Sequence, residues 1–268
     1  MRLYLCTDLI VRKLITLTWS VHQGIWLGLS SRKTLNKIAT RQYQVWSKYQ
    51  DETYNRSGFL LWERNVINHY FPNNSSVLVA AAGGGREVVA LQHDSYRADG
   101  FDCAEELVQS AKKVLKAEKI DCTYLKSLPD EVPSSLEVYD GAIIGWGGYM
   151  HIQGRNRRIA FLRQMKEHLP DSAPLLLSFF TRPEISKKHA LIRVIANSIK
   201  TIRLSSERLE TGDMLDSTFD HHFTELEIKS ELREAGFEMI YFSSECYGHA
   251  VASAIPGFKD KKKKKQNN

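Results

Sequence analysis

From residue 76 onward, short apolar runs alternate with longer amphipathic segments. The runs of strand length are 76–81, 96–102, 122–125, 139–146, 173–180, 237–244 and 248–255, and the helix-like segments begin at residues 86, 104, 155 and 224. In the second of these helices, Leu107, Val108, Ala111 and Leu115 recur on one side. Strands that alternate with helices in this way build βαβ units. The pattern therefore predicts an α/β fold: a Rossmann-like, mostly parallel sheet flanked by helices.

Two segments interrupt this alternation. Residues 1–74 are helical in pattern and rich in aromatic side chains, and residues 181–223 separate the fifth strand from the last clear helix. Additions to such sheets usually cover the carboxyl ends of the strands, where ligands bind. We therefore expect an N-terminal helical extension or lid (1–74) and a main domain (75–258) whose insertion 181–223 is a cap that binds substrate.

The charge of the chain is concentrated at its end. The 268 residues carry a formal net charge of +6, and the tail 259–268 holds six lysines against Asp260. The rest of the chain is close to neutral, which disfavours a nucleic-acid partner. A block of like charges repels itself, so the tail is expected to be disordered and dispensable for catalysis, with an anionic surface as the alternative partner.

The first thirty residues are unusually apolar, interrupted only by Asp8, Arg12 and Lys13 after the initial arginine. The run is marginal for a transmembrane helix and lacks a clean cleavage site for secretion. It is expected to be a helix packed on the main domain, with a peripheral helix lying on a membrane as the alternative. The four cysteines show no metal-binding or redox spacing. Together these features predict a cytoplasmic protein, with membrane contact through residues 1–30 and the lysine tail left open.

A glycine-rich turn follows the first strand in the stretch "VLVAAAGGGREVVAL". A P-loop would need a Lys-Ser/Thr pair after the glycines, and the turn has none. A dinucleotide fingerprint starting at Gly83 and Gly85 would need a small third residue, and Val88 stands there. Asp102 ends the next strand, where a carboxylate can accept hydrogen bonds from ribose hydroxyls. The turn and the acid together favour an adenosine-bearing cofactor.

With these motifs, the chain resembles class I S-adenosylmethionine-dependent methyltransferases. The resemblance rests on the glycine-rich stretch, on "ADGFDCAEELVQSAKK", on "YDGAIIGWGGYMHI" and on two later segments, and it covers about residues 76–245. It implies S-adenosyl-L-methionine as cofactor and S-adenosyl-L-homocysteine as product. The sequence departs from the family at Val79, where an acid is usual, and at Ala81, where glycine is usual. These departures leave a non-catalytic binding protein as an alternative.

The resemblance also assigns cofactor-binding positions. It places Ala81, Gly83 and Gly85 beside the methionine part, Asp102 and Cys103 at the ribose, Ser127 and Leu128 near the adenine, and Gly145 and Trp146 below the sulfonium. Arg86 begins the helix after the turn. It pairs either with the cofactor carboxylate or with an acid on the helix surface.

Methyl transfer to a hydroxyl is helped by a general base, most often histidine. His151 follows the loop after the fourth strand, and His221 and His222 lie in the expected cap, so these three are the candidate catalytic residues. Adjacent histidines diverge and no carboxylate has ligand spacing, so no metal is expected. A structural hydrogen bond is the alternative role for each.

Tyr149, Tyr49 and Tyr54 are the candidate substrate-binding residues. Tyr43, Trp46 and Tyr49 recur at helical spacing, which is typical of core packing and also compatible with a lid that excludes water. We expect a small-molecule or glycan-like methyl acceptor and O-methylation, with N-methylation of an amine as the rival. The sequence leaves the oligomeric state open.

Overall fold

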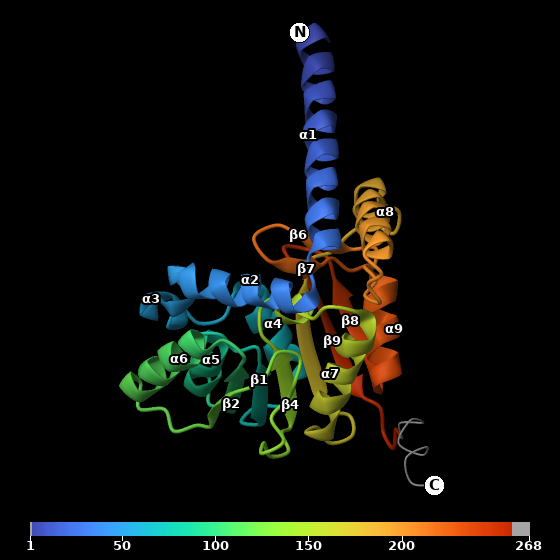
Figure 1. Cartoon of the computed structure of the whole chain (residues 1–268). Coiled ribbons are helices and arrows are strands. Elements are labelled where there is room, and N and C mark those ends of the chain that lie inside the picture. The colour runs from blue at the N-terminus through green and yellow to red at the C-terminus, as the bar shows by residue number, and fades with distance from the viewer. Residues whose placement is uncertain (1, 259–268) are drawn as a thin grey trace.

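A computed structural model describes residues 2–258, so the lysine-rich tail lies outside the described residues. Its main sheet has seven strands in the order β3-β2-β1-β4-β5-β9-β8 (Figure 1). Strands β1 to β5 are parallel, and β9 is antiparallel to both β5 and β8. The strands are β1 Ser76–Ala80, β2 Arg97–Asp102, β3 Tyr124–Lys126, β4 Gly141–Ile144, β5 Pro174–Phe179, β8 Phe237–Ser243 and β9 Gly248–Ala254. The predicted Rossmann-like α/β fold is confirmed.

Helices cover both faces of this sheet. They are α4 Leu61–Tyr70, α5 Arg86–His93 and α6 Glu105–Ala117 on one face, and α7 Arg155–Glu167 and α9 Glu225–Ala235 on the other. In β1, the side chains of Val77 and Val79 pack against α4, α5 and α6, whereas those of Leu78 and Ala80 face the core formed with α7 and α9. A strand buried on both faces reads as a continuous apolar run, which is why this strand was recognisable in the sequence.

The strand order creates a natural binding crevice. The chain leaves β1 for β2 on one side, and β4 later returns to pair with β1 on the other side. In open parallel sheets, ligands bind at the carboxyl ends of strands at such a reversal. The glycine turn, Asp102 and the loop after β4 all lie at this edge.

The N-terminal region consists of α1 Arg2–Leu29, α2 Arg32–Val45, the 3₁₀ helix η1 Ser47–Gln50 and α3 Glu52–Asn55, followed by α4. The first half of α1 projects beyond every other element (Figure 1). Its second half packs on α8 Lys187–Ile202. Among the helices of residues 2–258, none is long and apolar enough to cross a membrane.

Residues 181–223 hold α8 and a small antiparallel hairpin, β6 Asp213–Leu215 and β7 Phe219–His221. Both α1 and α8 contact β6, and α2 contacts β7. The two segments that interrupted the sequence pattern therefore pack on each other. A second 3₁₀ helix, η2 Gly148–His151, follows β4 and contacts β7.

Candidate active site

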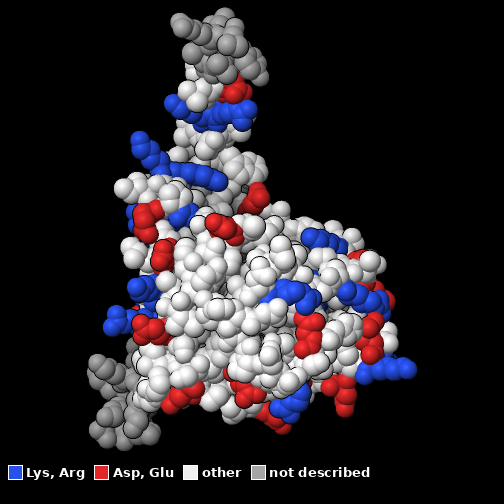
Figure 2. Space-filling model, turned by 180° about the vertical axis from the view of Figure 1, so that it is seen from behind, with Lys and Arg blue, Asp and Glu red and all other residues white. Residues whose placement is uncertain are grey.

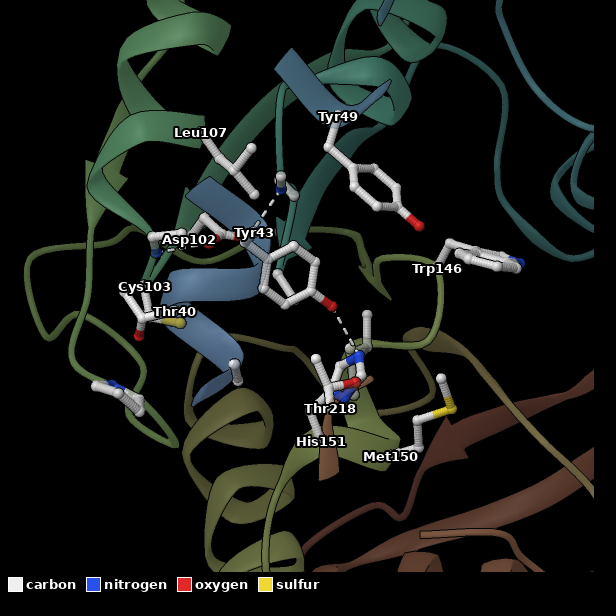
Figure 3. A pocket seen from close by; sticks show the side chains of 18 of the residues that line it. Thr40, Tyr43, Tyr49, Asp102, Cys103, Leu107, Trp146, Met150, His151 and Thr218 are labelled. Atoms are coloured by element: carbon white, nitrogen blue, oxygen red, sulfur yellow. Dashed lines mark hydrogen bonds between the residues drawn. The ribbon is translucent and has the colours of Figure 1, made fainter. Parts of the chain in front are cut away.

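A cavity of about 370 Å³ opens at the carboxyl ends of β1, β2 and β4. Its walls come mainly from six parts of the chain: the glycine turn, the end of β2 with the start of α6, the loop 127–131 after β3, α2 with the segment through α3, the loop after β4, and the hairpin around residues 216–220. Figure 3 shows side chains from these parts converging on one space. Both segments outside the sheet pattern thus contribute to the pocket wall.

The glycine turn bends sharply beneath this cavity. Ala81, Gly83 and Gly85 have positive φ values of 50°, 55° and 92°. A Cβ added to Gly83 would meet no atom within 4 Å, so a ligand has room to approach this backbone. At Gly84 an added Cβ would collide with the Tyr49 carbonyl oxygen and the Asn55 side chain. The absence of a side chain at Gly84, the middle glycine, therefore allows the N-terminal region to pack tightly over the turn.

Asp102 stands at the tip of β2 and is 7% exposed. Its Oδ2 accepts a hydrogen bond from the Gly83 amide at 2.9 Å, and its Oδ1 accepts one from the Ala104 amide at 2.8 Å (Figure 3). Burial raises the pKa of this carboxyl group, and the amide hydrogen bonds counter that effect. Each carboxylate oxygen keeps a further lone pair for a ligand hydroxyl.

Most residues assigned to the cofactor from the sequence line this cavity. They are Ala81, Gly83, Arg86, Asp102, Cys103, Ser127, Leu128 and Trp146. Gly85 and Gly145 lie just outside. An added Cβ on Gly85 would lie 3.2 Å from that of Ala111 in α6, and the Gly145 amide donates to the Ala80 carbonyl at 2.7 Å. These two glycines allow close packing beneath the pocket wall.

Arg86 is 2% exposed and its guanidinium is already paired. It donates to both carboxylate oxygens of Glu63 at 2.7 Å, to Glu87 at 2.7 Å and to the Gly58 carbonyl at 2.9 Å. Two roles were expected for Arg86, a pair with the cofactor carboxylate or with an acid on the helix surface. The structure shows pairs with the acids Glu63 and Glu87, and these pairs are buried rather than on the surface. They join α4 of the N-terminal region to α5 after the glycine turn.

His151 reaches the cavity from the end of η2 (Figure 3). Its Nδ1 lies 2.9 Å from the Phe219 carbonyl oxygen and 3.0 Å from Asp220 Oδ1. A carbonyl can only accept, so Nδ1 carries a proton and Nε2 of the neutral ring is an acceptor. Burial lowers the pKa of His151, but the hydrogen bond and charge of Asp220 outweigh it, so the net pKa is raised above its ordinary value.

The Nε2 atom of His151 accepts a hydrogen bond from the Tyr43 hydroxyl at 2.8 Å (Figure 3). Tyr43 belongs to α2, so this contact joins the N-terminal region to the loop after β4. Burial raises the pKa of Tyr43 well above its ordinary value, which keeps the phenol protonated. The geometry is that of a base whose acceptor nitrogen faces the pocket while its other nitrogen is held by a carboxylate.

Tyr49 and Tyr54 line the cavity, but Tyr149 does not. The Tyr149 side chain is fully buried, stacks on Phe223 and donates to Glu231 at 2.6 Å. Its expected contact with substrate is therefore corrected. The backbone of η2 turns this ring toward α9 and away from the pocket.

His221 and His222 also lie outside the cavity lining, which corrects their expected approach to the reaction centre. His221 is 1% exposed, and its Nδ1–H donates to Asp213 at 2.6 Å. Burial and the nearby Arg158 lower the pKa of His221 to about 3, so it stays neutral near pH 7. His222 packs beside Phe180 and His189. Both side chains serve the packing of the hairpin.

Ligand atoms of Glu210, Asp213 and His221 lie within 4.8 Å of one another. Arg158 donates to Glu210 at 2.7 Å and also pairs with the buried Glu231. Arg158 thus binds Glu210, and His221 binds Asp213, so the three groups belong to an internal network of ion pairs and hydrogen bonds among the described residues. It carries no argument for a metal.

Sequence reasoning missed three pocket residues in particular. They are Asn55, Asp220 and Tyr43, the last as the hydrogen-bond partner of His151. Side chains alternate along a strand, so Asp220 and His221 in β7 face opposite sides, and the pocket receives the acid. That alternation was a usable signal once the stretch "FDHHF" had been recognised as a strand. Nothing in the local sequence brings Asn55 over the glycine turn.

Comparison with solved structures identifies the fold. A SAM-dependent methyltransferase from Methanosarcina mazei matches with a TM-score of 0.58 at 18% identity, over 74% of this chain and 99% of that one. The 1,6-didemethyltoxoflavin N1-methyltransferase of Burkholderia thailandensis matches at 0.54 and 16%, over 82% and 89%. An amino pentose methyltransferase from Micromonospora echinaspora matches at 0.54 and 12%, over 81% and 95%. No family model and no curated protein matches the sequence. The chain has the class I methyltransferase fold.

Proposed function

We propose that the protein is an S-adenosylmethionine-dependent methyltransferase that O-methylates a small molecule or a glycan-like metabolite. The observation that carries this proposal is the arrangement of Asp102, Gly83 and His151 around one cavity. The solved structures of the same fold include proteins with bound S-adenosylmethionine or S-adenosylhomocysteine, which supports this cofactor.

The described residues fit this cofactor on three counts. The space above Gly83 is open, and the Asp102 carboxylate has acceptor capacity left for ribose hydroxyls. Asn55 lines the cavity, is 1% exposed, and its Oδ1 has no hydrogen-bond partner among the described residues. A buried acceptor without a partner is costly, and an ammonium group of the cofactor would satisfy it. When bound, the cofactor supplies an activated methyl group on a sulfonium.

His151 would act on the acceptor. Its Nδ1–H is held by Asp220 and the Phe219 carbonyl, so Nε2 is fixed toward the cavity and can take a proton from a hydroxyl. The Tyr43 hydroxyl occupies that nitrogen in this structure and marks where an acceptor hydroxyl would bind. The Asp220 carboxylate would stabilise the imidazolium that forms.

The remaining walls would position the acceptor and exclude water. Tyr43, Trp46, Tyr49 and Tyr54 supply an aromatic side of the cavity, and Trp146 lies across from Tyr49 (Figure 3). Aromatic faces attract a cationic centre within about 6 Å, which suits a sulfonium. Holding the acceptor in line with the methyl group supplies most of the rate in such a displacement.

A second candidate is N-methylation of a small amine. The cavity is lined by four acids on the side of the 130 and 216–220 loops, namely Asp130, Glu131, Asp216 and Asp220. Such a wall attracts a cationic amine through electrostatic complementarity. An amine can lose its proton to solvent before transfer, so it would not require His151.

Calorimetric titration with S-adenosylmethionine tests the cofactor assignment. Replacing Asp102 by alanine removes at least one charge-assisted hydrogen bond to the ribose, worth about 1.5–3 kcal/mol, so the affinity should fall at least about 10- to 100-fold. Asp99 is the matched control, because it lies in the same strand but accepts from the Thr123 amide and the Tyr139 hydroxyl instead. Unchanged affinity in folded Asp102→Ala protein would overturn the assignment.

A panel of hydroxyl and amine acceptors separates the two candidate reactions, with mass spectrometry to detect the added methyl group. We expect turnover on a hydroxyl that is lost in His151→Gln. Turnover confined to amines and retained in that variant favours N-methylation. Tight cofactor binding without methylation of any compound in a metabolite extract would instead indicate a binding protein.

A further inference from the structure

The first half of α1 exposes an unusually large apolar surface. Residues 9–19 project beyond the rest of the chain and are exposed on every side (Figures 1 and 2). Their large apolar side chains are about half exposed, for example Leu14 at 55% and Ile15 at 62%. Monomeric soluble proteins rarely expose a contiguous surface of this kind unless it contacts a partner or a membrane.

These side chains cover a broad arc of the helix. At about 100° per residue, the arc runs from Leu17 through Ile10, Leu14, Val11 and Ile15 to Trp19 and spans about 200°. Asp8, paired with Arg12, lies within this arc, and Leu9, 54% exposed, lies outside it on the opposite side of the helix. A helix that packs on one protein partner typically presents an apolar stripe of little more than about 100°. The wider arc fits immersion in lipid better than contact with a single helix.

The same face continues along the second half of α1. Ile25, Trp26 and Leu29 extend the exposed apolar side of the helix, whereas Gly24 and Gly28 on the other side contact α8. We call the exposed side the outer face of α1. Lys13 and Thr16 lie on the side that carries Gly24, and Arg12 lies at its edge, paired with Asp8 at 2.7 Å. Most of the exposed apolar side chains therefore lie away from the body of the protein, and Leu9 is the exception, between Lys13 and Thr16.

The hydroxyl groups of α1 do not depend on water. Thr16 donates to the Arg12 carbonyl at 2.8 Å, Thr18 to the Leu14 carbonyl at 3.0 Å, and Ser20 to the Thr16 carbonyl at 2.7 Å. In an apolar environment every polar group must find its partner within the protein. Thr18, which lies on the outer face, meets this condition through its own helix.

Two tryptophans mark the outer face where α1 leaves the body. Trp19 stacks on His22 with ring centroids 5.2 Å apart, and Trp26 meets the same imidazole edge-on at 6.3 Å. Both indoles are about half exposed. Tryptophan is enriched at the boundary between lipid and water because its ring is apolar and its N–H is polar.

We propose that the outer face of α1 lies on the surface of an anionic phospholipid bilayer. The apolar arc enters the acyl region, and the tryptophans lie at the level of the headgroups. The rest of the protein remains on the aqueous side. Lys13 and Arg12 flank the arc, and because Asp8 offsets the charge of Arg12, the net attraction to anionic headgroups comes from Lys13. This inference is independent of the proposed reaction, because none of these residues lines the cavity.

Flotation of the full chain with lipid vesicles tests it. We expect binding to vesicles of phosphatidylcholine mixed with phosphatidylglycerol, and weaker binding at higher salt because the basic groups contribute electrostatically. The double variant Ile15→Gln/Trp26→Gln should lower the partition coefficient at least about tenfold, since it replaces two immersed apolar side chains. Thr16→Gln is the matched control on the opposite side and should stay within about twofold.

Three results would overturn the inference. The wild-type chain fails to float with the mixed vesicles, or the double variant floats as well as Thr16→Gln. The third is a dimer in analytical ultracentrifugation that the double variant dissociates, which would assign the outer face to a second copy of the chain. Far-ultraviolet circular dichroism and the urea unfolding midpoint, measured in parallel, show that each variant remains folded.

Discussion

At the scale of single residues, the glycine turn combines Ala81, whose backbone is strained, with Gly83, whose backbone is not. Ala81 adopts a positive φ of 50°, which costs a non-glycine residue about 1–2 kcal/mol. Gly83 adopts 55° without that cost. Unusual backbone conformations of this kind persist where the surrounding structure imposes them, often at functional sites.

We therefore expect opposite effects from two exchanges. Gly83→Ala should lower the free energy of unfolding by about 1–2 kcal/mol and weaken cofactor binding, because its methyl group enters the open space above the turn. Ala81→Gly should raise stability by at most about 1 kcal/mol, since relief of strain is partly offset by the entropy of glycine. Urea unfolding and calorimetric titration check both. Unaltered binding in Gly83→Ala would place the cofactor elsewhere.

If His151 is the general base that we propose, it and Asp220 set the pH dependence of catalysis. A general base must be neutral, so the rate rises as pH passes its pKa, and the raised pKa of His151 places this limb above the ordinary value of about 6.5. Asp220→Asn removes the negative charge that favours the imidazolium, so the limb should move to lower pH. His151→Gln should lower kcat by about 10²- to 10⁴-fold and abolish the limb.

Rate–pH profiles of the three proteins provide the measurement, and His222→Gln is the control from the neighbouring hairpin. It lies outside the cavity lining and should keep both rate and limb. A limb that stays in place in Asp220→Asn would show that another group titrates. Near-normal kcat in His151→Gln would favour an amine acceptor.

At the scale of elements, the contact between α1 and α8 depends on two glycines. A Cβ on Gly28 would lie 2.7 Å from the Ile199 Cβ and 3.0 Å from the Ala196 carbonyl oxygen, and one on Gly24 would lie 2.9 Å from the Ile195 Cβ. Small residues at this spacing let two helices approach closely. The spacing was present in the sequence, but its partner helix was not identifiable there.

Gly28→Ala tests this contact through the sign of the change in the free energy of unfolding. In an exposed helix, alanine stabilises by about 1 kcal/mol relative to glycine. Here the added methyl group overlaps α8, so we expect the free energy of unfolding to fall by about 1–3 kcal/mol instead. Ser198→Ala on the exposed side of α8 is the control and should be neutral or slightly stabilising. Chemical unfolding measures both, and a gain in Gly28→Ala would contradict the tight contact.

At the scale of the whole molecule, the buried Arg86 cluster ties the N-terminal region to the sheet. Arg86→Ala leaves Glu63 and Glu87 without their cation and should cost about 3–5 kcal/mol. Arg64 offers a matched control, since its pair with Asp94 is exposed and should contribute no more than about 1 kcal/mol. Thermal and urea unfolding compare the two. Equal losses would mean that the cluster does not join the two parts.

The sequence by itself determined the class of fold and the position of the glycine turn at the end of the first strand. Both faces of the central parallel strands β1, β4 and β5 are buried, so their apolar runs are nearly continuous, and helices with an apolar face lie between the strands. The turn at Gly83 and the acid at Asp102 follow from local order along the chain, because Gly83 comes three residues after β1 and Asp102 is the last residue of β2. His151 could be placed for the same reason, since it follows the loop after β4.

Only the tertiary structure decided which residues complete the site. Tyr43 and Asn55 come from helices far along the chain from His151, and the sequence contains no local signal for long-range packing of this kind. The exclusion of Tyr149 and His221 depended on which side of a short helix or strand faces the cavity, and a rotation by one residue reverses that choice. The outer face of α1 likewise became visible only once α8 had covered the opposite side.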